Sequence, residues 1–326
     1  MDADKNILDD EYMMALFYLY LQEQTNTRKL LNKLESDLRL SNRFFPESKL
    51  CDAIKNLSKV SLCTLKKGST LYRCRLISKE DENLLFSKIT TEWFSLAQAV
   101  VPTFDVNGGD EEWIKFCLYV KNHPEALPPW QERHEQLLEK YSKISFWGYD
   151  EKGSDAPPKG TASPGRINPD GISYLYAAND IQTAVLEVRS IPTQFVSVAQ
   201  VELLEDVTIY SFIKPSSLEA DKSDPFDWVD YDEISRYFGQ PNYGGKSYYL
   251  ATQYISEYIK HLKDSNDQTI FDGLCFRSSL NPSGTNYVLF DVSQSKKYRI
   301  CNSSIYQVND LLGNTSCILP LSDSHF

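Results

Sequence analysis

The chain has 326 residues, a net charge of −11, 41% hydrophobic residues and 13% aromatic residues. This length allows one large domain with an extension, or two domains, and the composition excludes a disordered protein. Because no basic run offsets the negative charge, we expect no nucleic-acid partner.

Cysteine and hydropathy patterns exclude further classes. The seven cysteines are scattered without a Cys-x-x-Cys pair, which favours reduced thiols over a disulfide framework or a zinc site. The four histidines are dispersed as well, so we expect no metal. No stretch approaches about 18 uninterrupted apolar residues, and the acidic N-terminus lacks a signal-peptide pattern. We therefore expect a cytoplasmic protein without a membrane partner.

Helical periodicity dominates the first 65 residues. Apolar side chains recur at helical spacing over residues 9–40, with a break at 25–27, and a third helical stretch covers residues 47–57. We interpret residues 1–65 as a helical extension. The simplest interpretation is that this extension packs against the rest of the chain or forms a dimer. The alternative is that it recognises a partner. A homo-oligomer therefore remains an open prediction.

Mixed signals follow the extension. Leu71–Leu76 alternates as a strand, with Arg73 on its polar face, and residues 111–120 and 131–141 are helix candidates. Residues 147–171 are rich in Gly, Pro, Ser and Asp, which is typical of a functional or mobile loop.

The second half of the chain combines strands and helices without regular alternation. We expect strands at 172–177, 195–203, 207–212, 273–276 and 286–292, helices at 181–188 and 248–262, and an irregular polar segment at 215–247. Because β and α segments do not alternate regularly, the pattern favours a mixed α+β core over a doubly wound parallel sheet. The sequence predicts an α+β fold, with the extension at 1–65, the main domain at 66–296 and a C-terminal tail at 297–326.

The stretch from Gly165 to Glu187 carries the most specific chemistry. Arg166 lies in a turn between Gly165 and Gly171, where backbone can approach a ligand closely. Its guanidinium suits a phosphate or pyrophosphate, although most arginines are simply solvated. Tyr176 is either a core residue or a ring that stacks on nicotinamide or adenine.

One carboxylate, on Glu187, and one hydroxyl, on Ser278, complete the set of candidate site residues. Glu187 lies on a short helix among apolar neighbours, so its carboxylate needs either a partner or a role. Ser278 follows a strand, where turn chemistry is the ordinary explanation. There is no Gly-x-Ser-x-Gly elbow, no convincing histidine partner and no Walker-type loop, so we reject a hydrolase triad and a P-loop.

Five motifs in order resemble the RES family over roughly residues 66–295. They are an early Tyr-Arg strand, a Gly-Arg-x-Asn turn, a Leu-Tyr-x-Ala strand, a Thr-Ala-x-x-Glu helix and a late Asp-Gly strand ending in Ser. The matching residues are Tyr72-Arg73, Gly165-Arg166-Ile167-Asn168, Leu175-Tyr176-Ala177-Ala178, Thr183-Ala184-Val185-Leu186-Glu187, and Asp272-Gly273 through Ser278.

The resemblance implies an ADP-ribosyltransferase-like core, with a mixed β-sheet and surrounding helices, that consumes NAD+ by breaking the nicotinamide–ribose bond. It implies Glu187, Arg73 and Ser278 as catalytic residues. It also implies that Arg73 and Arg166 hold the pyrophosphate, that Tyr176 packs against nicotinamide, and that Ser278 positions the ribose or the nucleophile. Beyond NAD+ as substrate, no cofactor is expected.

The expected function is therefore that of an NAD+ phosphorylase or glycohydrolase acting as a toxin of a toxin–antitoxin or defence system. The expected partners are NAD+, phosphate and an antitoxin or regulatory protein. Two alternatives stay open, a protein ADP-ribosyltransferase and a non-catalytic nucleotide-binding module. The sequence departs from the family in having Phe276 where Tyr is frequent, and in the N-terminal helices and the segments 78–145 and 215–247.

Overall fold

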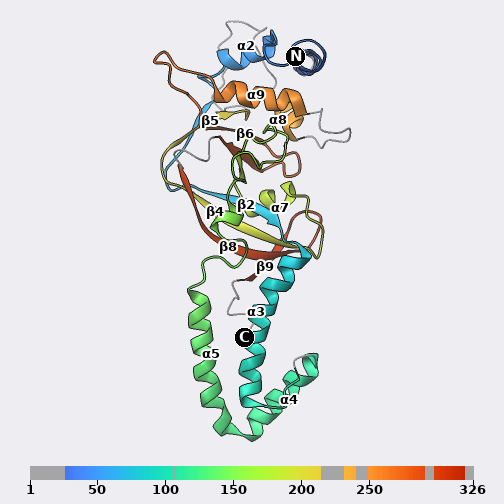
Figure 1. Ribbon diagram of the computed structural model, residues 1–326, viewed down its shortest axis with the longest axis vertical. Coiled ribbons are helices and arrows are strands. Elements are labelled where there is room, and N and C mark those ends of the chain that lie inside the picture. The colour runs from blue at the N-terminus through green and yellow to red at the C-terminus, as the bar shows by residue number, and fades with distance from the viewer. Residues whose placement is uncertain (1–25, 106–107, 214–230, 240–248, 291–296, 320–326) are drawn as a thin grey trace, which may run out of the picture. The chain divides into compact units, whose positions relative to one another are not determined.

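The fold is α+β, as the sequence predicts. In the computed structural model, the described residues are 26–105, 108–213, 231–239, 249–290 and 297–319. Within these ranges a nine-stranded sheet has the order β1-β5-β6-β7-β3-β2-β4-β8-β9 (Figure 1). The strands are β1 Leu62–Leu65, β2 Thr70–Leu76, β3 Leu175–Ala178, β4 Phe195–Leu203, β5 Val207–Ser211, β6 Gly273–Arg277, β7 Thr285–Leu289, β8 Tyr298–Val308 and β9 Thr315–Leu319.

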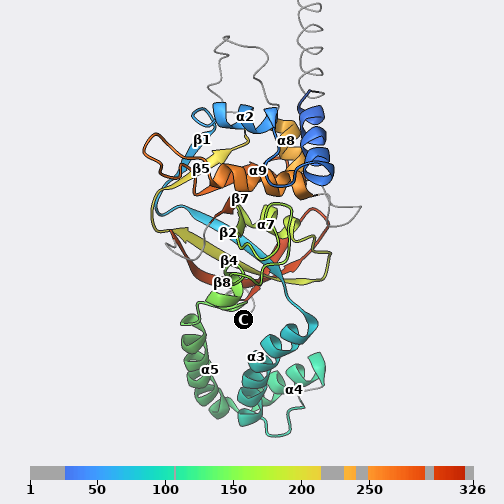
Figure 2. The ribbon, with the colours of Figure 1, turned by 45° about the horizontal axis from the view of Figure 1, so that its top comes forward.

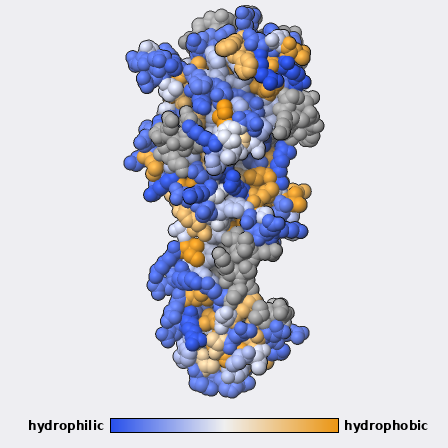
Figure 3. Space-filling view, in the orientation of Figure 1, coloured by the Kyte–Doolittle hydropathy of each residue, from blue (hydrophilic) through white to orange (hydrophobic). Residues whose placement is uncertain are grey.

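Helices account for most of the remaining regular structure. They are the helix at residues 26–40, α2 Lys49–Asn56, α3 Lys79–Val100, α4 Gly109–Asn122, the 3₁₀ turn Pro124–Ala126, α5 Leu127–Ser142, α6 Glu151–Ser154, α7 Ile181–Glu187, α8 Tyr231–Gly239 and α9 Leu250–Lys260. None of the helices in the described ranges is long and apolar enough to cross a membrane. Hydrophilic residues cover most of the face shown in Figure 3, with hydrophobic ones among them.

The sheet is mixed in strand direction. β5 and β6 are parallel, whereas β6 and β7, and β7 and β3, are antiparallel. At the middle of this group, Asn286 of β7 lies between Phe276 of β6 and Ala178 of β3. These three adjacent strands position the candidate site.

The chain divides into two compact units. The first comprises residues 1–73, 155–187 and 201–300, and the second comprises 74–154, 188–200 and 301–326. All five site residues expected from the sequence belong to the first unit. The predicted boundaries at 65/66 and 296/297 stay a prediction.

The core of the first unit lies between helices and the strands β5, β6 and β7 (Figure 2). The helix at 26–40, α2, α8 and α9 all contribute buried apolar residues to it. Aromatic rings dominate its centre, where the Phe238 centroid lies 5.3 Å from that of Phe212 and 5.4 Å from that of Phe276. The helix predicted at 248–262 is confirmed as α9, and its residues Ala251, Ile255 and Ile259 are completely buried.

Local signals explain where two helices begin. The Ser48 hydroxyl accepts a bond from the backbone N–H of Cys51 and caps α2. Asp180 caps α7 by accepting from the backbone N–H of Thr183 at 2.7 Å. Past the end of α7, Arg189 adopts the left-handed region with a φ of 54°, which stops the helix near Glu187.

The second unit contains the helices α3, α4 and α5. α3 and α5 run side by side (Figures 1 and 2), joined by the ion pair between Glu92 and Lys140. A small aromatic cluster joins α4 to this pair, with the centroids of Phe104 and Trp113 5.0 Å apart.

Several elements differ from the expectation. β1, α3, β8 and β9 were not predicted from the sequence, and α8 lies within the segment predicted to be irregular. β8 and β9 lie within the predicted tail 297–326, and β8 contains several polar residues in place of the regular apolar alternation of a half-buried strand. The strand expected from residue 172 begins only at Leu175. Residues 9–25, 214–230 and 240–248 lie outside the described ranges.

Candidate functional site

Glu187 is the last residue of α7, and its side chain is 19% exposed. A negative charge is unfavourable at this position, because the C-terminus of a helix carries partial negative charge. A partly buried carboxylate there therefore needs hydrogen-bond donors from elsewhere. The sequence raised this requirement, and three side chains meet it.

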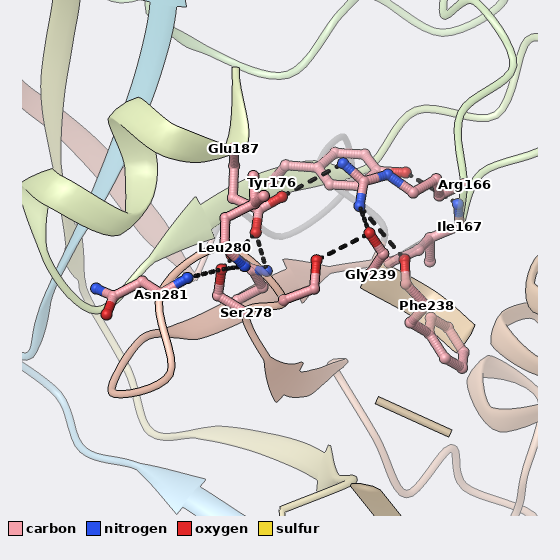
Figure 4. A network of polar contacts seen from close by, with 11 residues as sticks. Arg166, Ile167, Tyr176, Glu187, Phe238, Gly239, Ser278, Leu280 and Asn281 are labelled. Atoms are coloured by element: carbon pink, nitrogen blue, oxygen red, sulfur yellow. Dashed lines mark hydrogen bonds and ion pairs between the residues drawn. The ribbon is translucent and has the colours of Figure 1, made fainter. Parts of the chain in front are cut away.

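Two of the donors bind the same oxygen of Glu187. The Ser278 hydroxyl donates to Oε1 at 2.8 Å, and Asn286 Nδ2 donates to the same atom at 2.7 Å. The third donor is Arg166, whose Nη2 lies 3.3 Å from Oε2 (Figure 4). A carboxylate oxygen has two lone pairs, so Oε1 is saturated whereas Oε2 can accept a further bond. Oε2 is therefore the oxygen of Glu187 best placed to bind a ligand hydroxyl.

Ser278 is fully engaged by its neighbours. Besides donating to Glu187, its hydroxyl accepts from the backbone N–H of Leu280 at 3.1 Å and of Asn281 at 3.2 Å (Figure 4). A hydroxyl offers one donor and two acceptor lone pairs, so all three are used. The side chain is buried as well. This arrangement makes Ser278 a residue that orients Glu187.

Arg166 joins the carboxylate to the end of a helix. Its Nη1 donates to the carbonyl of Gly239, the last residue of α8, at 2.9 Å (Figure 4). Ser279 donates its hydroxyl to the same carbonyl at 3.0 Å. A cation is stabilised at the C-terminus of a helix, where carbonyl groups have no partner within the helix. Glu187 and the end of α8 thus hold the guanidinium from two sides.

Tyr176, on β3, presents its ring and not its hydroxyl. The hydroxyl donates to Asn168 Oδ1 at 2.7 Å and accepts from the backbone N–H of Ile167 at 3.3 Å. Burial raises the pKa of this hydroxyl, while the nearby Arg166 and Arg73 partly oppose that rise. The ring is partly buried against the core of the first unit. The ring surface is therefore the part of Tyr176 suited to contact a ligand.

The turn that carries Arg166 is fixed by its own residues. A Cβ atom at Gly165 would lie 2.4 Å from Asn168 Oδ1 and 3.1 Å from the Tyr176 hydroxyl. Gln253 of α9 donates to the carbonyls of Gly165 and Asn168 at 2.7 and 3.1 Å. The sequence predicted that backbone at Gly165 approaches a ligand closely. In the structure, Gly165 makes room for Asn168 and Tyr176.

Arg73 reaches the same region from β2. Its Nη1 donates to the backbone carbonyl of Tyr176 at 3.0 Å. The five expected residues are thus brought together in two groups. Arg166, Glu187 and Ser278 form one bonded network, and Arg73 and Tyr176 form the other group, joined by the bond to the Tyr176 carbonyl.

Sequence reasoning missed three components of the site. Asn286 binds Glu187, Asn168 binds Tyr176, and the carbonyl of Gly239 binds Arg166. Two of the three had a signal in the sequence: Asn168 belongs to the Gly-Arg-x-Asn motif, and Asn286 is an asparagine within the strand β7, where asparagine is uncommon. The Gly239 carbonyl had no signal, since a backbone group carries no residue identity.

Two further observations bear on the chemistry. Phe276, which the sequence marks as a departure from the RES motif, is buried and packs on Phe238. Among the described residues, no three His, Cys, Asp or Glu side chains are grouped as metal ligands would be.

Comparison with known proteins identifies the family. A family model described as the RES domain matches residues 133–307, more than half of the 326-residue chain. No curated protein matches. No solved structure matches either. The matched span includes Arg166, Tyr176, Glu187, Ser278 and Asn286, whereas Arg73 precedes it. The chain belongs to the RES domain family.

Proposed function

We propose that this protein consumes NAD+ by breaking the N-glycosidic bond between nicotinamide and ribose. The observation that supports this most is the carboxylate of Glu187, held by Ser278, Asn286 and Arg166 with Oε2 left able to accept. Cleavage of a glycosidic bond passes through an oxocarbenium-like ribose, which a fixed negative charge stabilises. Membership of the RES family supports the same chemistry.

The reaction divides into bond breakage and capture of the ribose. The bond from ribose C1′ to the nicotinamide nitrogen breaks, and neutral nicotinamide leaves with the electron pair. Glu187 Oε2 accepts a hydrogen bond from a ribose hydroxyl and stabilises the positive charge that develops at C1′. An oxygen of phosphate or water then bonds to C1′. Phosphate gives ADP-ribose phosphorylated at this same carbon, which is numbered 1″ in ADP-ribose. Water gives ADP-ribose and releases a proton.

The remaining residues bind and orient the substrate in this proposal. Arg73 and Arg166 bind the pyrophosphate, and the Tyr176 ring packs against nicotinamide. A guanidinium has five N–H donors, and the bonds from Arg166 to Glu187 and to the end of α8 leave donors for phosphate oxygens. Ser278 keeps Glu187 in its reactive orientation, which fixes the geometry before substrate arrives.

The biological role we propose is that of a toxin in a toxin–antitoxin or defence system, neutralised by an antitoxin or regulatory protein. An enzyme that consumes NAD+ without control would deplete the cell that makes it, so such an activity requires a partner that restrains it. Expression of the chain should lower cellular NAD+ and stop growth. Expression of the Glu187→Gln variant should do neither.

The decisive experiment follows NAD+ and its products with the purified chain. Mass spectrometry with and without phosphate should show nicotinamide and either ADP-ribose or its 1″-phosphate. Glu187→Gln should lower the rate on the order of a thousandfold, as loss of a group that stabilises transition-state charge does. Glu139→Gln is the matched control, since Glu139 on α5 is exposed and forms an ion pair with the equally exposed Lys143 just past the end of that helix.

Two results would contradict the proposal. NAD+ that stays intact beside a folded chain would favour the non-catalytic binding module. Label transferred only to a protein acceptor would show instead that the chain is a protein ADP-ribosyltransferase. Circular dichroism of Glu187→Gln separates a lost carboxylate from a lost fold.

A further inference from the structure

The helix α4 in the second unit exposes an apolar stripe. Ile114 is 60% exposed and Leu118 is 53% exposed. The opposite side of the helix is buried, with Phe116 packed into the aromatic cluster of this unit. α4 is thus apolar on both sides, although only one side has a partner within its unit. Exposed apolar stripes of this kind mark contact surfaces.

A shallow groove of about 440 Å³ follows the exposed stripe. Every residue that lines it belongs to α4, so no other described element forms a wall of the groove. The lining residues are Trp113, Ile114, Cys117, Leu118 and Lys121. The groove is therefore shallow and open, and it suits a second helix better than a small ligand.

The charges along the stripe indicate which helix fits. A charged residue flanks the two apolar residues at each end, and we call the whole set the stripe. In chain order it consists of Glu111, Ile114, Leu118 and Lys121, with spacings of three, four and three residues. This order of spacings is the same in both directions. When a second copy of α4 is laid against the first in antiparallel orientation, each acidic residue therefore faces a basic residue and each apolar residue faces an apolar one. Glu111 and Lys121 are both exposed, and within the described part of the chain neither forms an ion pair, although Glu111 interacts electrostatically with Lys115 one turn along α4.

We infer that α4 binds α4 of a second copy of this chain, in antiparallel orientation about a two-fold axis. Ile114 of each copy then lies against Leu118 of the other, and Glu111 against Lys121, twice in each dimer. A parallel pair is disfavoured, because it would place Glu111 beside Glu111 and Lys121 beside Lys121. The stripe is self-complementary in one orientation only.

The contact is small. α4 has 14 residues, and a helix of that length spans roughly 21 Å. Such a contact falls below the area of a standard stable interface, so the dimer should be weak and dependent on protein concentration. Salt should reduce the share of the affinity that comes from the two charge pairs.

Charge reversal tests both the contact and its orientation. Sedimentation equilibrium of the full chain should show a reversible dimer. Lys121→Glu and Glu111→Lys should each raise the dissociation constant about tenfold, by turning two attractions into two repulsions. The double variant carrying both changes should recover the wild-type constant, because the reversed charges again face opposite partners.

An apolar variant supplies the matched comparison. Ile114→Asp should abolish dimerisation, whereas Leu311→Asp, at another highly exposed leucine, should leave it unchanged. Equal melting temperatures across the set would show that each variant folds. A chain that stays monomeric at every concentration overturns the inference. A dimer indifferent to Ile114→Asp, or single reversals that the double variant does not rescue, overturns it as well.

Discussion

At the scale of single residues, the candidate site depends on how one carboxylate is satisfied. Oε1 of Glu187 receives both Ser278 and Asn286, and both donors come from the β6–β7 hairpin. Two donors on one oxygen stop the carboxylate from rotating and reserve the other oxygen for Arg166 and a ligand. Asn286 is therefore a positioning residue for Glu187 in the proposed reaction.

Replacing this amide with an acid should make stability depend on pH. In Asn286→Asp, the introduced carboxyl would lie against the Glu187 carboxylate, so its pKa in the folded protein should rise above the ordinary value of about 3.9. A raised folded pKa gives stability that is present at low pH and lost as pH rises through that value. Each unit by which this pKa differs between the folded and unfolded protein changes the free energy of unfolding by up to about 1.4 kcal/mol. Thermal melts should show a larger loss of stability at pH 8 than at pH 5.

Asn179→Asp is the control for the added charge. Asn179 is exposed, and its side-chain oxygen accepts a hydrogen bond from the backbone N–H of Thr285, which a carboxylate can accept equally well. Its stability should therefore change little between the two pH values. Asn286→Asp should also lower kcat for NAD+ loss more than it changes KM. Equal pH profiles for the two variants would show that Asn286 does not bear on Glu187.

At the scale of elements, the turn carrying Arg166 acts as one unit with β3 and α9. Asn168 joins the turn to Tyr176, and Gln253 joins it to α9. The Gly165 position has no space for a side chain, although its backbone needs no left-handed conformation. Packing within the turn, and not backbone strain, requires this glycine.

Gly165→Ala should therefore displace the turn. The added methyl group meets Asn168 and the Tyr176 hydroxyl, and overpacking of this kind costs roughly 1–3 kcal/mol. We expect a lower melting temperature together with a clear loss of NAD+ cleavage. Gly68→Ala is the comparison, because Gly68 has a φ of 83° and nothing within 4 Å of its added Cβ. That variant should lose stability but keep its activity.

Strong local patterns made some elements predictable. The helices predicted at 181–188 and 248–262 correspond to α7, which Asp180 caps, and to α9, whose apolar residues recur at helical spacing. α3 has no comparable stripe, because apolar, β-branched and charged residues are spread around it. β1 is short and mostly exposed, and β8 contains the polar run Asn302-Ser303-Ser304. Sheet pairing, and not local preference, determines the conformation of such strands.

For the site, sequence order indicated which residues matter but not what each one binds. Glu187 was expected to need a partner, and the partners lie 21, 91 and 99 positions away along the chain. The motifs included Arg166 and Ser278 but not Asn286. Contacts over such separations depend on strand register, which periodicity does not encode.

At the scale of the whole molecule, burial divides the seven free cysteines into distinct groups. Cys63, Cys117 and Cys317 are exposed, whereas Cys51, Cys74 and Cys275 are buried. Burial raises the pKa of the Cys51 thiol to about 11 and that of Cys275 to about 12. Only the thiolate reacts with an alkylating reagent, so these buried thiols lack both access and charge at pH 8.

Alkylation of the dilute folded chain at pH 8 should therefore label the exposed cysteines within minutes and leave Cys51 and Cys275 unmodified. Peptide mass spectrometry identifies the labelled positions. Addition of urea should make all seven react, because unfolding restores an ordinary thiol pKa of about 8.5. Rapid labelling of Cys275 without urea would contradict the packing of β6 described above.

The bond between Arg166 and the end of α8 has a consequence for how relatives of this protein are compared. The acceptor is a backbone carbonyl of Gly239, in a segment that none of the five family motifs includes. A relative can thus retain all five motifs and still lack this support for its arginine, when the segment equivalent to α8 is shortened or replaced. Alignments of the family are therefore best sorted by the length of that segment before activity is transferred from one member to another.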